Sequence, residues 1–569
     1  MYNKTDLKNK LESIHRKSYP AYKSLRGNYS FGDFVLSIDH VQGDPFATPS
    51  SLHVELPLTK AGFPEKYFKK RHAKIALEDL ILRRFSALLN QYSFKAKGSG
   101  KSGLISTSRP GAEVIRRTAM EFNDTALIAR FEVGFPANGR TINAQESEKI
   151  LLDFLPQIVK KCLFYQAWDK IEIQDVYELA ENQQTIREVL EEKKLVAFCA
   201  NGSVLPRKSG VSSQPLKGAV AFESPKSMEI SIDLPFGGRI CGMGISEGVT
   251  LIIGGGYHGK STLLQALEQG VYNHVKGDGR EYVITRANAL KLRAEDGRVV
   301  SSLDLSLFIH DLPNGKDTYC FSTEDASGST SQAAGVIEGI EAGTSCFLVD
   351  EDTSATNFLL RDAFMQRVVS GEQEPITPFI ARVRDLYEKA GISTILVAGS
   401  SGAFFHVADT IIQMDAYRPK DVKAKVQELL PEYPSVDFSG NAEAFALPTK
   451  KRMFVMERKA KRHARGDREE RIKTKVMGTD GFSIEHNMVD LRYVEQLIDT
   501  EQTAALAAIL KYIVKKGAVS MEMQALVAEI CSLLDKKGMA AFVDGTLSCG
   551  YAYPRKEEIF MMLDRFHRG

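Results

Sequence analysis

The sequence lacks the features of a secreted, a membrane-spanning or a polycationic protein. Its seven cysteines show no C-x-x-C motif and no paired spacing, which argues against a zinc site or a disulfide framework. No apolar run approaches the length that crosses a bilayer, and residues 1–19 lack the apolar stretch of a secretion signal. The net charge is only +2, so any affinity for nucleic acid must come from a local charge asymmetry. We therefore expect a cytoplasmic protein with no part in a membrane.

The most informative stretch is a glycine-rich segment that fits the phosphate-binding P-loop pattern G-x-x-x-x-G-K-[ST]. It follows the apolar, β-branched run at 249–253 and precedes a helical pattern at 263–267, which is the context that the motif requires. Glycines let backbone N–H groups approach phosphate oxygens, the lysine would reach the β and γ phosphates, and the serine would hold Mg²⁺. A glycine-rich turn that binds nothing is the disfavoured alternative. The expected nucleotide-binding residues are Gly254, Gly255, Gly256, Tyr257, His258, Gly259, Lys260, Ser261 and Thr262.

An acidic pair follows a second apolar run, at 345–349. A buried strand that ends in two carboxylates is typical of ATPases, where the first binds Mg²⁺ and the second orients or deprotonates the attacking water. We assign these roles to Asp350 and Glu351, with Lys260 as the group that stabilises phosphate charge. An exposed acidic loop is the alternative for an isolated pair.

Residues 95–103 imitate the end of a P-loop but fail the motif, because position 95 is Lys and no apolar strand precedes it. A flexible surface loop is favoured over a second nucleotide site. Its lysines, glycines and hydroxyls leave a third possibility, contact with a polynucleotide backbone through Lys101.

The charge balance shifts sharply at 450–475, where twelve Lys and Arg face four Asp and Glu, a net charge of +8. A solvated basic helix or linker is the ordinary interpretation of such a run. Its concentration in an otherwise neutral chain favours backbone contacts with nucleic acid, and base stacking is poorly supported because aromatic residues are few. The candidate residues are Lys451, Arg452, Arg458, Lys459, Lys461, Arg462 and Arg465.

Several segments together resemble the ATP-binding cassette (ABC) class. Residues 326–330 are similar to its signature loop, and residues 350–357 to its acidic strand end and D-loop. The chain is identified as a member of a family of predicted ABC-class ATPases that are not transporters, which includes an RNA-editing-associated protein of kinetoplastid mitochondria. The hallmarks cover nearly the whole chain: residues 39–47, 254–264, 277–281, 295–298, 326–332, 350–358 and 374–379.

The resemblance implies a head-to-tail homodimer with two shared sites for ATP and Mg²⁺. The P-loop of one copy would face Ser327, Gly328 and Ser329 of the other. Two departures matter: no histidine follows the strand pattern at 394–397, and Asn357 replaces the D-loop carboxylate. Ser400 or His258 could supply part of the missing γ-phosphate contact. ATP binding is therefore expected more firmly than fast hydrolysis.

The expected fold is α/β, with a P-loop ABC-type ATPase core. The 569 residues are too many for one core, so two to four domains are expected. We expect an N-terminal α+β domain over residues 1–195 and an ABC-type ATPase domain over 196–440. A basic segment and a mostly helical C-terminal domain would occupy 441–569.

The leading hypothesis is a dimeric ABC-class ATPase whose nucleotide state controls its grip on nucleic acid, with RNA favoured. The alternative is an ATP-gated protein-interaction module with slow or no hydrolysis, in which the basic run binds an acidic protein. A small-molecule kinase is weaker, because kinases need no signature loop.

Overall fold

The computed structural model describes residues 1–210, 212–361, 374–399, 401–433, 444–456 and 472–567. These residues form two compact units, one of residues 1–182 with 539–553 and the other of residues 183–538 with 554–569. The division falls within helix α6, Lys170–Glu192. Among the described residues, no helix combines the length and the apolarity that crossing a bilayer requires.

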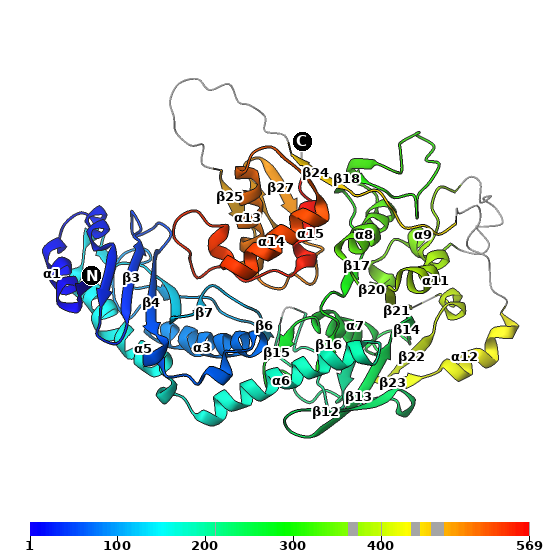
Figure 1. Ribbon diagram of the computed structural model, residues 1–569, viewed down its shortest axis with the longest axis horizontal. Helices are drawn as coiled ribbons and strands as arrows, with labels where there is room; N and C mark the ends of the chain where they lie inside the picture. Colours follow the sequence, from blue (N-terminus) through cyan, green and yellow to red (C-terminus); the bar gives the residue numbers. More distant parts are fainter. Residues whose placement is uncertain (211, 362–373, 400, 434–443, 457–471, 568–569) are drawn as a thin grey trace. The chain divides into compact units, whose positions relative to one another are not determined.

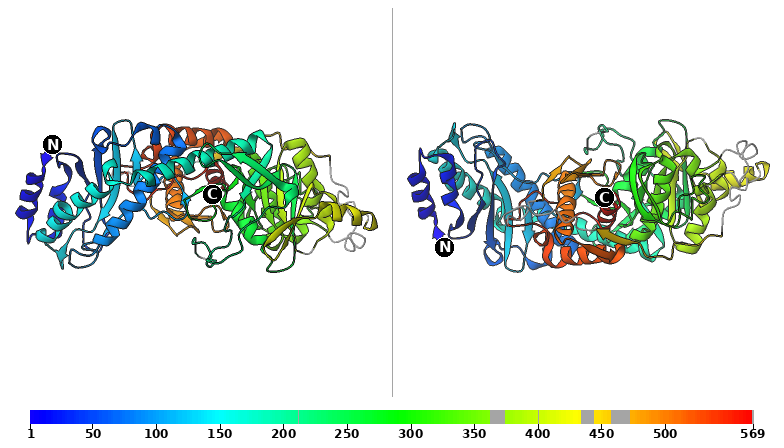
Figure 2. Two further views of the ribbon diagram at one scale, coloured as in Figure 1. Left: turned by 90° about the horizontal axis from the view of Figure 1, so that it is seen from below. Right: turned by 90° about the horizontal axis from the view of Figure 1, so that it is seen from above.

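The first unit is built on a seven-stranded sheet, mostly antiparallel, in the order β1-β2-β3-β4-β8-β5 with β7 also paired to β8. Helix α3, Arg71–Tyr92, packs on this sheet, where Phe85 meets Phe131 of β8 edge to face (Figures 1 and 2). The strands are β1 Tyr2–Asn3, β2 Gly27–Ser30, β3 Val35–His40, β4 Ser50–Pro57, β5 Ile105–Ser106, β7 Met120–Phe122 and β8 Ala126–Val133.

The other helices of this unit complete its core. Residues 144–162 form a helical stretch made of α4, a π-helical segment at 149–154, and α5. The segment at 539–553 returns from the C-terminal part of the chain, and the Thr118 amide donates to the Tyr551 carbonyl over 2.9 Å. The bounds are α1 Lys4–Ile14, α2 Leu58–Ala61, α4 Ala144–Glu148 and α5 Leu155–Cys162.

The second unit is organised around a six-stranded sheet in the order β17-β20-β21-β14-β22-β23 (Figure 1). All neighbours are parallel except β22 and β23, so the carboxyl ends of β20, β21, β14 and β22 meet at one edge. Strand β23 pairs outside β22 and forms the edge of the sheet. The strands are β14 Val249–Ile253, β17 Leu290–Leu292, β20 Cys346–Asp350, β21 Ser393–Val397, β22 Thr410–Asp415 and β23 Arg418–Asp421.

A four-stranded antiparallel sheet, in the order β12-β13-β11-β16, accompanies the main sheet. Smaller antiparallel pairings join β18 to β19, β24 to β28, and β26 to both β25 and β27. The strands are β11 Leu195–Ala200, β12 Glu229–Asp233, β13 Arg239–Ser246, β16 Val283–Thr285, β18 Arg298–Leu303, β19 Phe321–Ala326, β24 Met453–Met456, β25 Thr474–Val476, β26 Gly481–Ile484, β27 Asn487–Asp490 and β28 Val519–Glu522.

The helices of the second unit include the one after the P-loop, α7, and the one after the signature-like loop, α8. Helices α13, α14 and α15 make the C-terminal region largely helical, as the sequence predicted. The bounds are α7 Lys260–Gln269, α8 Gly328–Ala342, α9 Thr356–Leu359, α11 Phe379–Ala390, α12 Lys423–Leu429, α13 Thr500–Lys515, α14 Met523–Lys537 and α15 Lys556–Asp564.

Candidate nucleotide site

The glycine-rich segment forms a tight loop between the central strand β14 and helix α7. Gly254 has φ +140°, and a Cβ atom there would lie 2.4 Å from the Met414 carbonyl oxygen, so only glycine fits. Gly259 has φ +97° and precedes the first residue of α7. Tyr257 also has a positive φ, +65°, and its side chain is 98% exposed. The loop thus leaves Gly255, Gly256 and Tyr257 open to solvent at the helix N-terminus, where an anion is favoured.

Lys260 folds back over this loop. Its ammonium donates to the carbonyl oxygen of Gly254 over 2.7 Å and to that of Gly255 over 3.1 Å. The ammonium therefore lies at the mouth of the cradle that we predicted, where it can exchange two neutral acceptors for phosphate oxygens. Ser261 follows on the exposed first turn of α7.

His258, which we considered for a γ-phosphate contact, instead forms hydrogen bonds with the turn between β22 and β23. Its Nδ1 accepts a hydrogen bond from the Ala416 amide over 2.9 Å, and its carbonyl oxygen accepts one from the Tyr417 amide over 3.1 Å. The side chain thus fixes the P-loop to the turn between β22 and β23. Ser400, the other candidate for a γ-phosphate contact, lies outside the described residues.

The acidic pair lies at the carboxyl end of β20, two strands from the P-loop strand. Asp350 is 7% exposed, and burial raises its pKa because the charged form loses water. A divalent cation beside the carboxylate would reverse that direction. The carboxylate of Asp350 and the hydroxyl of Ser261 are hard oxygen donors of the kind that Mg²⁺ prefers, so these two residues fit the ion.

Glu351 is oriented by the segment where a histidine was expected. Its Oε2 accepts a hydrogen bond from the Gly399 amide over 2.5 Å. Gly399 follows β21, which lies between β20 and β14 in the sheet. A backbone N–H therefore positions this carboxylate, a contact that the sequence could not reveal because every residue except proline has the same donor.

The signature-like loop caps helix α8. The Ser327 hydroxyl oxygen accepts a hydrogen bond from the Thr330 amide over 3.4 Å, and Ser327 itself is exposed. Gln332 then connects this helix to the segment after the acidic pair. Its Nε2 donates to the Ser354 hydroxyl over 2.8 Å, and its Oε1 accepts from the Ala355 amide over 2.9 Å. The signature-like loop and the D-loop are thus one hydrogen-bonded assembly.

Three family models match successive parts of the chain. They are described as the N-terminal part of an ATPase of the ABC class, over residues 4–166, the P-loop domain of an ABC ATPase, over 169–451, and the MRB1590 C-terminal domain, over 473–569. The chain belongs to the ABC-class ATPase family. Nucleotide binding follows from this membership, and the predicted family and P-loop fold are confirmed.

A relative in the archaeon Methanocaldococcus jannaschii, the uncharacterized protein MJ1628, is 32% identical over 251 residues. The match covers 42% of this chain and 54% of the relative, so the chain spans about half the length of that protein. Two solved structures of MJ1267, described as an ATP-binding cassette of an ABC transporter, are also similar. The first, in its ADP conformation, has 13% identity, covers 35% of this chain and 90% of its own, and has a TM-score of 0.23. The second has 12% identity, 42% and 96% coverage, and a TM-score of 0.25.

The basic run divides into described and undescribed parts. Arg458, Lys459, Lys461, Arg462 and Arg465 lie outside the described residues. Arg452 requires a correction, because it is 7% exposed and forms ion pairs of 2.5 Å with Asp564 and with Glu341. The Arg452 guanidinium is therefore buried in the core of the unit and cannot bind a polyanion, so its predicted contact with nucleic acid is wrong. Lys451 is exposed and pairs with Glu522 over 2.9 Å, a weak surface contact that a phosphate can displace.

The loop at 95–103 of the first unit is held by hydrogen bonds to its own domain. The Lys101 amide donates to the Pro45 carbonyl over 2.8 Å, and the Ser99 amide donates to the Ala137 carbonyl over 2.7 Å. Two hydroxyls that we considered for phosphate contact also serve the loop: Ser102 bonds the Ser99 carbonyl over 2.6 Å, and Ser99 accepts from the Gly139 amide over 2.9 Å. The side chain of Lys101 remains at the exposed surface.

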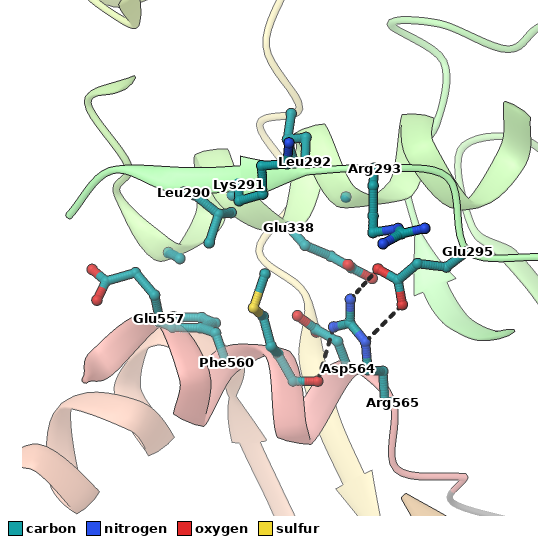
Figure 3. A pocket seen from close by; sticks show the side chains of 14 residues that line it. Leu290, Lys291, Leu292, Arg293, Glu295, Glu338, Glu557, Phe560, Asp564 and Arg565 are labelled. Carbon is teal, nitrogen blue, oxygen red and sulfur yellow. Dashed lines mark hydrogen bonds and ion pairs between the residues drawn. The ribbon is translucent and has the colours of Figure 1, made fainter. Parts of the chain in front are cut away.

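Buried charges connect the C-terminal helix α15 to the signature-like helix α8, a feature that no sequence pattern indicated. Arg565, the residue after α15, donates a hydrogen bond from Nε to Oε2 of Glu295 over 3.1 Å. Figure 3 shows this pair close to Glu338 of α8. Arg298 bonds both oxygens of Glu338, at 3.1 and 2.7 Å. These ion pairs are almost fully removed from water, so their geometry is well defined.

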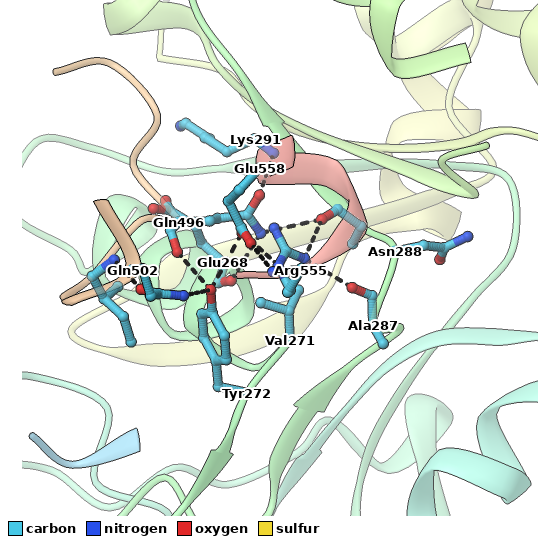
Figure 4. A network of polar contacts seen from close by, with 12 residues as sticks. Glu268, Val271, Tyr272, Ala287, Asn288, Lys291, Gln496, Gln502, Arg555 and Glu558 are labelled. Carbon is cyan, nitrogen blue, oxygen red and sulfur yellow. Dashed lines mark hydrogen bonds and ion pairs between the residues drawn. The ribbon is translucent and has the colours of Figure 1, made fainter. Parts of the chain in front are cut away.

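A second polar network connects the C-terminal region to the end of helix α7. Figure 4 shows Gln496 between the two, and its Nε2 donates to the Glu268 carbonyl over 3.1 Å. The Tyr272 hydroxyl donates to the Gln496 carbonyl over 2.9 Å and accepts from Gln502 over 3.0 Å. The C-terminal region therefore contacts both the helix that follows the P-loop and the helix that follows the signature-like loop.

Proposed function

We propose that this protein binds Mg-ATP at a homodimer interface, hydrolyses it slowly, and couples the nucleotide state to nucleic-acid binding in the cytoplasm. The P-loop geometry carries the proposal. Gly254 and Gly259 adopt backbone conformations that suit glycine, and Lys260 lies over the loop that they shape.

The acidic pair supports hydrolysis. Glu351 is held by a backbone amide near the P-loop strand, where it can orient an attacking water, while Ser261 and Asp350 would hold Mg²⁺. When bound, the ion neutralises charge on the β and γ phosphates. The segment after β21 has no histidine that could contact the γ-phosphate, and this favours slow turnover.

The exposed N-terminus of α8 supports a shared site. Ser327 caps a 15-residue helix that begins at the buried Gly328, and the helix dipole favours an anion at this end. Ser327 is exposed there, and its hydroxyl contacts the amide and the hydroxyl of Thr330 in the first turn of the helix. In a head-to-tail dimer, this helix end would complete the phosphate site of the partner copy.

A Glu351→Gln variant tests the shared site, because the amide keeps the oxygen that accepts from Gly399 but cannot act as a base. We expect ATP and Mg²⁺ to shift this variant from monomer to dimer in light scattering. Asp352→Asn, at the adjacent exposed position, is the matched control and should behave as the unaltered protein. A Glu351→Gln protein that stays monomeric with saturating ATP contradicts the shared site.

Nucleic-acid binding draws support from the last two lysines of the basic run. Lys473, just before strand β25, and Lys475, within it, are both exposed. We expect log affinity for random-sequence RNA to fall linearly with log salt concentration. Exchanging both lysines for Glu should reduce that slope by about 1.4, since each contact with a single strand contributes about 0.7. Lys425→Glu, on α12 and outside the run, is the control. Absence of RNA retention at low salt would favour the protein-interaction alternative.

A further inference from the structure

The turn between β22 and β23 has an unusual backbone. Its two central residues, Ala416 and Tyr417, have φ values of +45° and +68°, although neither is glycine or asparagine. Two consecutive left-handed residues form the tight hairpin turn that Asn-Gly sequences normally occupy. A strained conformation of an aromatic residue persists only where its surroundings fix it, and such positions are concentrated at ligand sites.

The surroundings that fix this turn belong to the P-loop. The Tyr417 amide bonds the His258 carbonyl over 3.1 Å, and the Ala416 amide bonds the His258 ring over 2.9 Å. A Cβ atom on Gly259 would lie 3.1 Å from Cδ1 of Tyr417, so the missing side chain at 259 lets the phenol ring approach the phosphate cradle. Tyr417 is nevertheless 52% exposed. An aromatic face is thus held beside the cradle with about half of its surface open.

The order of the sheet indicates which end of a nucleotide points toward this ring. Asp350 and Glu351 follow β20, which lies on one side of the P-loop strand β14, beyond β21. Strand β22 and its turn lie on the other side of β14 (Figure 1). The γ-phosphate must face the acidic pair for hydrolysis, so the nucleoside end leaves the cradle on the side of β22.

We propose that Tyr417 is the stacking platform for the purine base of the bound nucleotide. The proposal rests on nucleotide binding at the P-loop and assigns the base subsite of that same site. The strained turn would hold the ring in place before the base arrives, which reduces the entropy lost on binding. Stacking on an aromatic ring tolerates different bases, so the ring would strengthen binding more than it would select between purines.

The test compares ATP with inorganic tripolyphosphate, which has the phosphates but no base, by calorimetric titration of the full-length protein with Mg²⁺ present. The informative variant is Tyr417→Asn, since asparagine tolerates the left-handed conformation and lacks the ring. We expect it to bind ATP about 5- to 150-fold more weakly, the range for loss of one base-stacking contact. Its affinity for tripolyphosphate should change by less than about 2-fold. Tyr417→Phe should bind both ligands as the unaltered protein does.

Tyr433→Ala is the matched control, because it removes another exposed tyrosine of the same unit, 66% exposed, outside the turn. Unchanged ATP binding by Tyr417→Asn would overturn the proposal. An equal loss of ATP and tripolyphosphate would also overturn it, because the residue would then support the P-loop and not a base. An unaltered protein that binds neither ligand would refute nucleotide binding itself, and the two failures are therefore distinct.

Discussion

Glu268, near the end of the P-loop helix α7, should make the free energy of unfolding depend on pH. Its side chain is 7% exposed, and burial raises its pKa to about 8, with a further contribution from the nearby carboxylate of Glu495. The negative end of the helix dipole disfavours a carboxylate at this position as well. In the folded protein at neutral pH, Glu268 should therefore be protonated, whereas in the unfolded chain it ionises near its ordinary pKa of 4.5.

The sign and the size of the effect follow from proton linkage. Below the unfolded pKa of 4.5 both states hold the proton, and Glu268 has no influence on the pH dependence. As pH rises toward 8 only the unfolded state releases it, so the free energy of unfolding falls by about 1.4 kcal/mol per pH unit. A Glu268→Gln variant keeps the shape of the neutral carboxyl and removes this slope. The free energy of unfolding of this variant, relative to that of the unaltered protein, should rise by about 3 kcal/mol between pH 5.5 and 7.5.

The measurement is guanidinium unfolding of both proteins at these two pH values. The difference between their free energies of unfolding is taken at each pH, so that the contributions of other titrating groups cancel. Glu428→Gln, at an exposed position of α12, is the control and should show the same difference at both values. If the difference for Glu268→Gln does not change with pH, then the carboxylate is ionised in the folded protein. Lys291, whose charge acts to lower this pKa, would be the responsible partner.

Two further predictions concern positions whose structural demands are clear. Gly254→Ala should destabilise the protein by about 2 kcal/mol or more and abolish ATP binding, because its Cβ atom would meet the Met414 carbonyl at 2.4 Å. Gly256→Ala, with no atom within 4 Å of the new Cβ, should unfold as the unaltered protein does in the same thermal scan. Arg298→Met should cost about 3–5 kcal/mol in a denaturant titration, since it leaves Glu338 buried without its partner. The double variant Arg298→Met with Glu338→Leu should recover most of that loss, and a double variant as unstable as the single one would contradict a paired charge.

The sequence predicted the parts of the site that depend on local chain conformation. The P-loop could be recognised because glycine is required at fixed spacings between a strand and a helix, and the structure has Gly254 and Gly259 in conformations that suit glycine. The strand before Asp350 could be recognised because a buried parallel strand is apolar throughout. The signature-like loop also lies at a helix N-terminus as the pattern indicated, with Ser327 as the capping residue.

The remaining contacts join residues far apart in the chain, and no local pattern encodes them. The hydrogen bond from Gly399 to Glu351 uses a backbone group that carries no residue-specific signal. Arg452 belonged by sequence to a basic run, yet tertiary packing places it on Asp564, more than a hundred residues away. Tyr417 was invisible as a base platform because its approach to the P-loop depends on the pairing of β14 with β22.

These long-range contacts suggest how the C-terminal region can respond to the nucleotide site. Gln332 bonds the segment after the acidic pair, and one turn and a half further along α8, Glu338 binds Arg298. Glu341 on the same helix and Asp564 on α15 share Arg452. A buried ion pair tolerates little separation, because the stretched charges would lie unpaired at low dielectric. If α8 is displaced, α15 must therefore move with it or these ion pairs must break.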